Sequence, residues 1–238
     1  MTLLCAFYLD ADLARRGELL ECLRRNEANP AFDEVHLWLE SPGDPARMVA
    51  AYPILKSLKI RLIAYGQRVT YLDLFNYANR SLAGCPVAIA NADIYFDDSV
   101  RELNDLDLTG KLLCLSRWDI QPDGTERLFD HPFSQDAWIF AAPIREFPCD
   151  FHLGVPGCDN RLAFEARRAG LTLSNPAKSI RAFHLHLSGV RRYSEQQRIG
   201  GPASGVAAGT LEFPRQPAHR PGTARSTGSA LELHSEAT

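Results

Sequence analysis

Carboxylates follow a buried strand in the stretch VAIANADIYF, residues 87–96. Small and apolar residues fill 87–90, and Asn91 and Asp93 come directly after them. Burying an unpaired carboxylate is costly, so Asp93 either marks only the turn out of the strand or faces a cleft where it holds a positive partner. In open α/β sheets, ligands bind beyond the carboxyl ends of the strands. A carboxylate there can bind Mg²⁺ or Mn²⁺, which can in turn carry the diphosphate of a nucleotide.

Two histidines lie close together late in the chain, in the stretch AFHLHLSGVRRY of residues 182–193. Alternate residues of a strand point to the same face, so His184 and His186 could reach one metal ion or one phosphate. Alternatively, one of them only covers the edge of a sheet. Arg191 follows, and its guanidinium suits a phosphate through paired hydrogen bonds, although a solvated basic loop is an equal interpretation.

Further candidates flank a glycine-rich turn and an aromatic strand. Asp159 and Asn160 stand where the turn GVPGC becomes a helix; Asp159 is either a helix cap or an acid that the turn brings close to a ligand. Asp136 precedes the strand that contains Trp138. The indole is either a platform for a sugar or base, or a core side chain. Asp136, Trp138 and Asn160 are therefore candidate contacts of an acceptor or other substrate.

The elements that must position these residues alternate between strands and helices in the first half of the chain. The hydrophobic spacing predicts strands at 3–9, 34–40, 59–65 and 87–96, and helices at 11–26, 44–57 and 70–82, the last capped by Thr70. Such alternation implies right-handed crossovers. We therefore predict an α/β fold with a mostly parallel central sheet and helices on both faces.

The second half of the chain is less regular. Strands are expected at 111–118, 136–142, 171–176 and 179–188, and a helix from Asp159 to Gly170, a natural residue for a helix end. From about Gly200 the composition is rich in Gly, Pro, Ala, Ser and Thr, which cannot offset the entropy of ordering. We predict one domain over 1–199 and a disordered low-complexity tail over 200–238.

Composition narrows the classes of function. The chain has 238 residues, 45% hydrophobic and 23% charged, with a net charge of −3. No basic run interleaves with aromatic residues, so no nucleic-acid partner is expected. No apolar stretch approaches the length of a membrane span, and the N-terminus lacks the features of a signal peptide, which favours a cytoplasmic protein. The six scattered cysteines indicate buried thiols; a zinc site of Cys149, Cys158 and the two histidines would match no structural zinc spacing.

The combination of these features resembles a known family. Strand-helix repeats that end in Asn91-Ala92-Asp93, then a glycine-rich turn with an acid at a helix start, then a histidine, resemble the GT-A nucleotide-diphospho-sugar transferases, especially the family-2-like glycosyltransferases. Asn91-Ala92-Asp93 looks like the Asp-x-Asp motif of that family with Asn in place of the first acid. The resemblance covers roughly residues 1–193 and implies a Rossmann-like GT-A fold.

The resemblance also implies roles for the candidate residues. Asp93 and one of His184 and His186 would bind Mn²⁺ or Mg²⁺, as the late histidine does in several inverting members. Asp159 would be the general base that deprotonates the acceptor hydroxyl, which implies inversion at the sugar. If Asp159 only binds the acceptor, a retaining course is open.

The remaining family-derived roles concern the donor. Asn91 and Asp93 would lie at the diphosphate, Arg191 would contact it, and Asp10, after the first strand, would lie at the base and ribose. The expected partners are a nucleotide-diphospho-sugar and a sugar, glycan or other hydroxyl acceptor.

Two other classes of function use the same residues. A metal-dependent hydrolase would place Asp93, Asp159, His184 and His186 around a metal with bound water, and would need no acceptor. A non-catalytic module would bind a nucleotide-sugar without turning it over, since a fold does not dictate chemistry.

Overall fold

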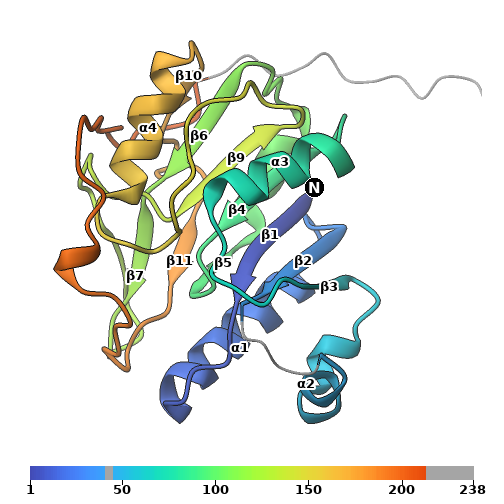
Figure 1. Cartoon of the computed structure of the whole chain (residues 1–238). Helices are drawn as coiled ribbons and strands as arrows, with labels where there is room; N and C mark the ends of the chain where they lie inside the picture. Colours follow the sequence, from blue (N-terminus) through green and yellow to red (C-terminus); the bar gives the residue numbers. More distant parts are fainter. Residues whose placement is uncertain (41–44, 213–238) are drawn as a thin grey trace, which may run out of the picture.

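Seven strands form a central sheet in the computed structural model, which describes residues 1–40 and 45–212 (Figure 1). Their spatial order is β10-β6-β9-β4-β1-β2-β3. The strands are β1 (Thr2–Phe7), β2 (Glu34–Leu39), β3 (Ile60–Ala64), β4 (Pro86–Ala90), β6 (Lys111–Leu115), β9 (Ala137–Ala141) and β10 (Thr172–Ser174). Strand β9 runs antiparallel to β4 and β6, and the other pairs are parallel. The predicted mostly parallel sheet is confirmed.

A smaller sheet stands beside the carboxyl ends of β4 and β6. Its order is β5-β11-β7-β8, with β5 (Ile94–Phe96), β7 (Arg117–Ile120), β8 (Glu126–Leu128) and β11 (Ala182–His184). Strand β5 follows β4 after three residues, and β7 follows β6 after one residue. The chain therefore passes from the large sheet to the small one at these two places and again between β10 and β11, and the first of these passages contains Asp93.

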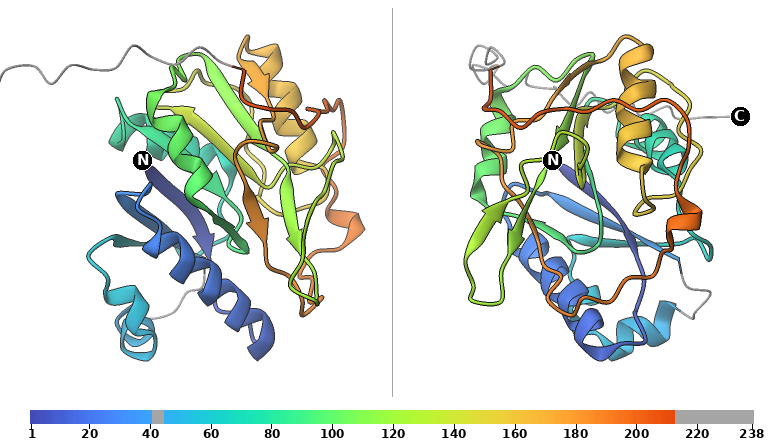
Figure 2. Two further views of the ribbon diagram at one scale, coloured as in Figure 1. Left: turned by 180° about the vertical axis from the view of Figure 1, so that it is seen from behind. Right: turned by 90° about the vertical axis from the view of Figure 1, so that its left-hand side faces the viewer.

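Helices cover both faces of the large sheet, as predicted (Figure 2). Helix α1 (Leu13–Ala28) packs Leu19 and Leu23 into the core on one face, and helices α3 (Tyr71–Ser81) and α4 (Cys158–Arg168) pack on the other. The remaining helical elements are α2 (Pro45–Ala51) and the 3₁₀ segments η1 (Pro53–Lys56), η2 (Asp98–Asp105) and η3 (Glu195–Gln197). Within residues 1–40 and 45–212, no helix combines the length and apolar character that crossing a membrane requires.

Local sequence explains how several of these elements begin and end. The side chain of Thr70 accepts a hydrogen bond from the Asp73 amide, and the Asp73 carboxylate accepts one from the Thr70 amide, which confirms the predicted cap of α3. The expected helix over 44–57 is instead interrupted, because Pro53 has no amide hydrogen to donate. Helix α2 ends at Ala51 and the chain continues as the short segment η1.

The expected single strand over 87–96 is two strands in different sheets. After Ala90 the chain leaves the large sheet, and the Ile94 amide donates to the Asn91 carbonyl across the turn between them. Strand β5 then pairs with β11 in the small sheet. Apolar residues on both sides of Asn91 and Asp93 suggest one strand and do not reveal that the chain changes partners there. The change places Asp93 at the junction of the two sheets.

Residues 200–212, which belong to the expected disordered tail, lie against the folded body. The amides of Ser204, Val206 and Gly209 donate to the carbonyls of Asn160, Pro132 and Asn175. Val206 is buried. A side chain at Gly205 would come within 3.0 Å of the Pro132 carbonyl, so small residues allow this close approach of two backbones. Ordered contacts therefore extend past the expected boundary at 199; residues 213–238 lie outside the described residues.

Candidate functional site

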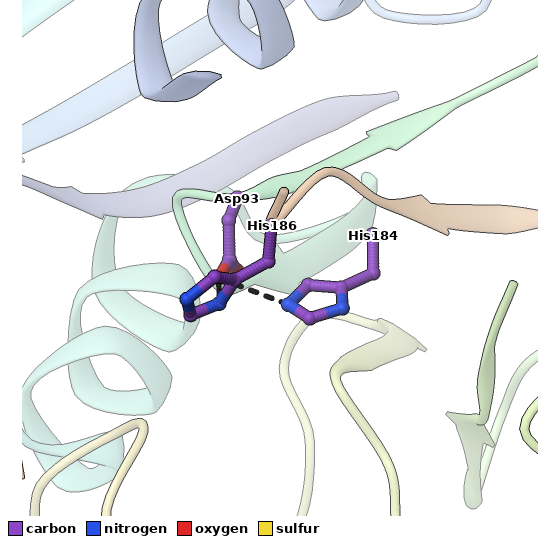
Figure 3. A group of neighbouring side chains, drawn as sticks. All are labelled: Asp93, His184 and His186. Carbon is purple, nitrogen blue, oxygen red and sulfur yellow. Dashed lines mark hydrogen bonds and ion pairs between the residues drawn. The ribbon is translucent and has the colours of Figure 1, made fainter. Parts of the chain in front are cut away.

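Asp93, His184 and His186 converge at the junction of the two sheets (Figure 3). One potential ligand atom from each residue lies within 4.8 Å of the other two. The Oδ2 atom of Asp93 is 3.2 Å from His184 Nε2 and 3.7 Å from His186 Nδ1. The pairing of β11 with β5 places His184 opposite Ile94, and the Leu185 amide donates to the Asp93 carbonyl. The structure thus brings together the three residues that the sequence suggested as metal ligands.

Asp119 orients His184 from the opposite side. His184 Nδ1 lies 2.8 Å from Asp119 Oδ1, and the two residues are register partners on β11 and β7. Burial alone would lower the pKa of His184, but the carboxylates of Asp119 and Asp93 outweigh it and raise the pKa to about 9. The two carboxylates therefore favour the protonated ring, which can donate to both of them.

Arg15 is the closest cationic partner of Asp93. Its Nη2 atom lies 2.5 Å from Asp93 Oδ2, and its Nη1 atom donates to Glu18 Oε2 and to the Leu185 carbonyl. Arg15 is 5% exposed. Burial alone would raise the pKa of Asp93, but hydrogen bonds and charges from His184 and Arg15 hold that pKa well below its usual range. Asp93 is therefore ionised and pairs through Oδ2 with two positive partners.

His186 differs from His184 in its surroundings. Burial first, and the positive charge of Arg15 second, lower its pKa, so the ring is neutral at physiological pH. Its Nε2 atom is buried and has no hydrogen-bond partner among the described residues. A neutral imidazole with an unused nitrogen can accept a hydrogen bond or ligate a metal.

A second ion-paired group adjoins the first one. Arg117 donates from Nε to Asp119 Oδ1 at 2.8 Å and from Nη1 to Asp136 Oδ2 at 2.9 Å. Asn91 donates from Nδ2 to the other oxygen of Asp136 at 3.1 Å. A carboxylate at position 91 would face the Asp136 carboxylate, so the amide of Asn91 suits this position. The expected candidate Asp136 thus connects Asn91 to the Arg117–Asp119–His184 chain.

Asp159 lies at the start of α4, but it is not the helix cap. Gly157 occupies the cap position with a φ of 78°, and Asp159 is in the first turn. Its Oδ2 atom accepts a hydrogen bond from the Gln135 amide at 3.1 Å. Burial, reinforced by the neighbouring charge of Asp136, raises the pKa of Asp159 to about 6. Such a carboxyl group can exchange a proton near neutral pH.

The other two candidate acceptor contacts have different surroundings. Trp138 is 1% exposed and packs in the core, where its ring meets Tyr71 edge to face with centroids 4.8 Å apart. The structure therefore supports the core interpretation of Trp138 and leaves no exposed platform there. The backbone carbonyl of Asn160 accepts from the Ser204 amide, and its side-chain Oδ1 is buried with no partner in residues 1–40 and 45–212.

The two candidate donor contacts, Asp10 and Arg191, have different hydrogen-bond partners. Asp10, after β1, accepts hydrogen bonds from Arg192 Nε and Nη2, and these lower the pKa of Asp10 to about 2. Arg191 instead donates to the Tyr193 hydroxyl and is exposed. Arg192, which the sequence did not single out, is thus the arginine that reaches the end of β1.

The alternative zinc site with cysteine ligands does not form. In the described part of the chain, the one group of at least three potential ligands within reach of one ion contains Asp93, His184 and His186 and neither cysteine. Burial raises the pKa of the Cys149 and Cys158 thiols to about 12. All the cysteines are free, and Cys85 is the exposed exception to the expected buried thiols.

One carboxylate and two imidazoles suit a divalent transition metal such as Mn²⁺. Asp119 on His184 Nδ1 is the carboxylate–histidine arrangement that commonly fixes the ring of a metal ligand. His186 Nδ1, 3.7 Å from Asp93 Oδ2, is the second imidazole nitrogen that faces this carboxylate. The residues therefore fit a divalent cation. The Arg15 guanidinium, however, already contacts the Asp93 oxygen that both imidazoles face.

Three residues of the site, Arg15, Arg117 and Asp119, were not identified from the sequence. The buried face of α1 contains Arg15, Leu19, Cys22 and Asn26. The helical spacing could have drawn attention to Arg15, because it places a charged residue on the face that packs inward. Arg117 and Asp119 alternate in a short strand and carried no signal beyond their charge.

Comparisons with known proteins rest on structure alone, because no family model and no curated protein matches the sequence. The mannosyltransferase PcManGT of Pyrobaculum calidifontis, in complex with GDP-Man and Mn²⁺, is 18% identical over 74% of this chain and 54% of its own, with a TM-score of 0.45. S. aureus TarS 1-349, in complex with UDP-GlcNAc, is 13% identical over 52% and 36%, with a TM-score of 0.36. The 4-diphosphocytidyl-2C-methyl-D-erythritol synthase of Anaerococcus prevotii is 15% identical over 59% and 68%, with a TM-score of 0.38. The matches thus span about half of the mannosyltransferase and about a third of TarS.

Proposed function

We propose that this chain is a GT-A-type glycosyltransferase that moves a sugar from a nucleotide-diphospho-sugar to an acceptor hydroxyl. The observation that carries the proposal is the convergence of Asp93, His184 and His186 beyond the carboxyl end of β4. Ligands of open α/β sheets bind at this edge. Asp159, whose pKa is raised to about 6, adjoins the same network through Gln135 and Asp136. A group that can bind a cation at the leaving diphosphate and a carboxylate that can accept the acceptor's proton together suit inverting sugar transfer.

On the donor side, Asp93, His184 and His186 would hold a divalent cation. That cation would supply positive charge to the diphosphate as it leaves the sugar. Asp119 keeps the Nε2 atom of His184 directed at Asp93. Arg117 in turn anchors Asp119 and Asp136, so the groups around the diphosphate would be fixed before the donor binds.

On the acceptor side, Asp159 would take the proton of the attacking hydroxyl. A general base works best when its pKa lies close to the working pH, and a pKa of about 6 leaves most of the group ionised at neutral pH. Attack from the face opposite the diphosphate gives inversion. Asn160 follows Asp159 directly in the chain, and Asp136 lies close enough in space to affect its charge; both are the proposed acceptor contacts.

A thermal-shift screen tests the donor site. UDP-, GDP-, CMP- and dTDP-sugars are each added with and without Mn²⁺ to the wild type, to Asp93→Asn and to the control Asp123→Asn, which changes an exposed loop carboxylate. We expect one nucleotide to raise the melting temperature of the wild type and the control in the presence of Mn²⁺, and not that of Asp93→Asn. Each shift is measured relative to the same variant without ligand, because Asp93→Asn alters the stability itself.

The outcomes separate the three classes of function. Transfer of sugar to a panel of acceptors, measured by mass spectrometry, supports the transferase. Release of free sugar at the same rate with and without acceptors would favour the hydrolase. Binding without turnover in the wild type, unaffected by Asp159→Asn, would favour the binding module. A protein that no nucleotide stabilises would contradict the proposed donor site.

A further inference from the structure

Arg15 occupies the space that a cation at Asp93 would need. Its guanidinium and the two imidazole rings all face the same oxygen, Asp93 Oδ2. The side chain of Arg15 is 6% exposed and that of Asp93 is 12% exposed, so water screens this pair weakly. An arginine remains charged throughout the accessible pH range. The negative charge that would attract a divalent cation is therefore already compensated by a permanent one.

Contacts on its other side hold the guanidinium in place. Arg15 Nη1 donates to Glu18 Oε2, and Glu18 itself accepts from the amide and the hydroxyl of Ser188. The same Nη1 atom donates to the Leu185 carbonyl. Leu185 and Ser188 bracket His186 in the chain, so Arg15 is bonded to the segment that supplies one of the imidazoles. A change in the position of Arg15 would thus act on Asp93 and on the His186 segment together.

We infer that Arg15 is a resident counter-ion that opposes divalent-cation binding at Asp93, His184 and His186 and so sets the metal affinity of the site. The inference rests on the metal site of the proposed function. A cation bound to Asp93 Oδ2 would stand next to the guanidinium, and like charges at such a distance repel each other strongly where water is excluded. Cation binding therefore requires the guanidinium to leave Asp93. Glu18 provides a second carboxylate for it, and the diphosphate of a donor would provide another anion.

Direct titration of the metal tests this role without any nucleotide. Free Mn²⁺ is measured from its electron paramagnetic resonance signal as it is added to the wild type, Arg15→Met and Arg15→Lys. Methionine retains an apolar stem of similar length, and lysine retains the charge on a compact ammonium. We expect Arg15→Met to bind Mn²⁺ about tenfold more tightly than the wild type, or more, and Arg15→Lys to show a smaller gain.

Two further variants locate the effect. Arg24→Met removes an exposed arginine on the same helix whose ion pair is with Glu21, and should leave Mn²⁺ affinity unchanged. Arg15→Met combined with Asp93→Asn should lose the tight binding. Binding by Arg15→Met that is equal to or weaker than that of the wild type would overturn the inference, as would tight binding that persists in the double variant. If Arg15→Met does not fold, Arg15→Lys decides, and an unchanged or weaker affinity overturns the inference.

Failure of the counter-ion role and failure of the transferase proposal give different results. If Arg15→Met binds Mn²⁺ more tightly through Asp93 while no nucleotide-sugar binds to the wild type, the counter-ion role stands and the transferase proposal fails. If the wild type binds a donor and transfers sugar while no variant gains Mn²⁺ affinity, the transferase proposal stands and the counter-ion role fails.

Discussion

Asp93 and Asp159 are both buried acids near the junction of the two sheets, yet the protein treats their charges in opposite ways. Asp93 faces a guanidinium and an imidazolium, which hold its pKa well below the usual range. Asp159 accepts a hydrogen bond from the Gln135 amide, forms no ion pair within residues 1–40 and 45–212, and has a pKa raised to about 6. The difference keeps Asp93 permanently ionised and suits Asp159 to proton exchange.

The largest expected effect is the loss of transfer rate in Asp159→Asn. Loss of a general base lowers the transfer rate by about 10²–10⁴-fold. Because the amide removes a charge that burial penalises, the free energy of unfolding above pH 6 should stay unchanged or rise. The measurements are the transfer rate with a saturating donor and urea unfolding at pH 7.5. A rate within threefold of the Asp123→Asn control would show that Asp159 is not the base.

Asp93→Asn should lower the free energy of unfolding. It leaves the charges of Arg15 and His184 without their shared carboxylate, and removing one partner of a buried pair costs about 3–5 kcal/mol of stability. Equilibrium urea unfolding at pH 7.5 measures the loss. Asp123→Asn should stay within about 0.5 kcal/mol of the wild type. A loss for Asp93→Asn below about 1 kcal/mol would mean that the ion pairs contribute little.

The two carboxylates should also respond oppositely to pH. The folded pKa of Asp159 is raised to about 6, so its contribution is fully present below the unfolded value near 4 and is lost as pH rises through 6. The folded pKa of Asp93 is lowered, so its contribution is present above about pH 4 and is lost as pH falls further. The stability difference between Asp159→Asn and the wild type should therefore grow by about 2 kcal/mol from pH 4 to pH 7.

The ionisation of Asp159 should also determine how the transfer rate depends on pH. Because a general base acts when ionised, the transfer rate of the wild type should rise with pH through about 6, in a profile recorded at fixed ionic strength. A flat profile between pH 5 and pH 7 would contradict proton transfer to Asp159.

Gly157→Ala should have the smallest effect of these variants and should affect the Asp159 region without affecting Asp93. Gly157 has a φ of 78°, and an added Cβ would come within 3.0 Å of the Ile199 carbonyl. The left-handed conformation costs an alanine about 1–2 kcal/mol. Because Gly157 precedes Asp159, the transfer rate should fall while Mn²⁺ binding at Asp93 is unchanged. Gly124→Ala, in an open hairpin turn with a similar φ, controls for backbone strain alone. A parallel loss of Mn²⁺ binding would show that the two regions are not independent.

Much of the fold was predictable from local patterns. The alternation of strands and helices predicted the parallel part of the large sheet, and Thr70 predicted the cap of α3, because periodicity and capping depend on neighbouring residues. The change of sheet after Ala90 was not predictable, since residues 87–90 and 94–96 are both apolar and suggest one continuous strand. The contacts of 200–212 were also missed, because composition measures side chains while that segment is held largely through its backbone.

The candidate site shows the same division. The two histidines and Asp93 could be assigned from their types, spacing and family resemblance, and the structure brings them together. Trp138 could not be assigned, because an aromatic residue in a strand suits a core and a binding face equally. Arg192 rather than Arg191 reaches Asp10, and adjacent residues in a loop give no sign of which one turns inward.

By itself, the sequence determined which residues could ligate a metal or accept a proton, and the strand and helix order that carries them to one edge of a sheet. Only the tertiary structure decided the charge state of each. Arg15 reaches Asp93 from a helix near the N-terminus, and Asp119 reaches His184 from a neighbouring strand. Asp159 is left without a cation. The pKa of a side chain depends on burial and on charges within a few ångströms, and these belong to residues far apart in the chain.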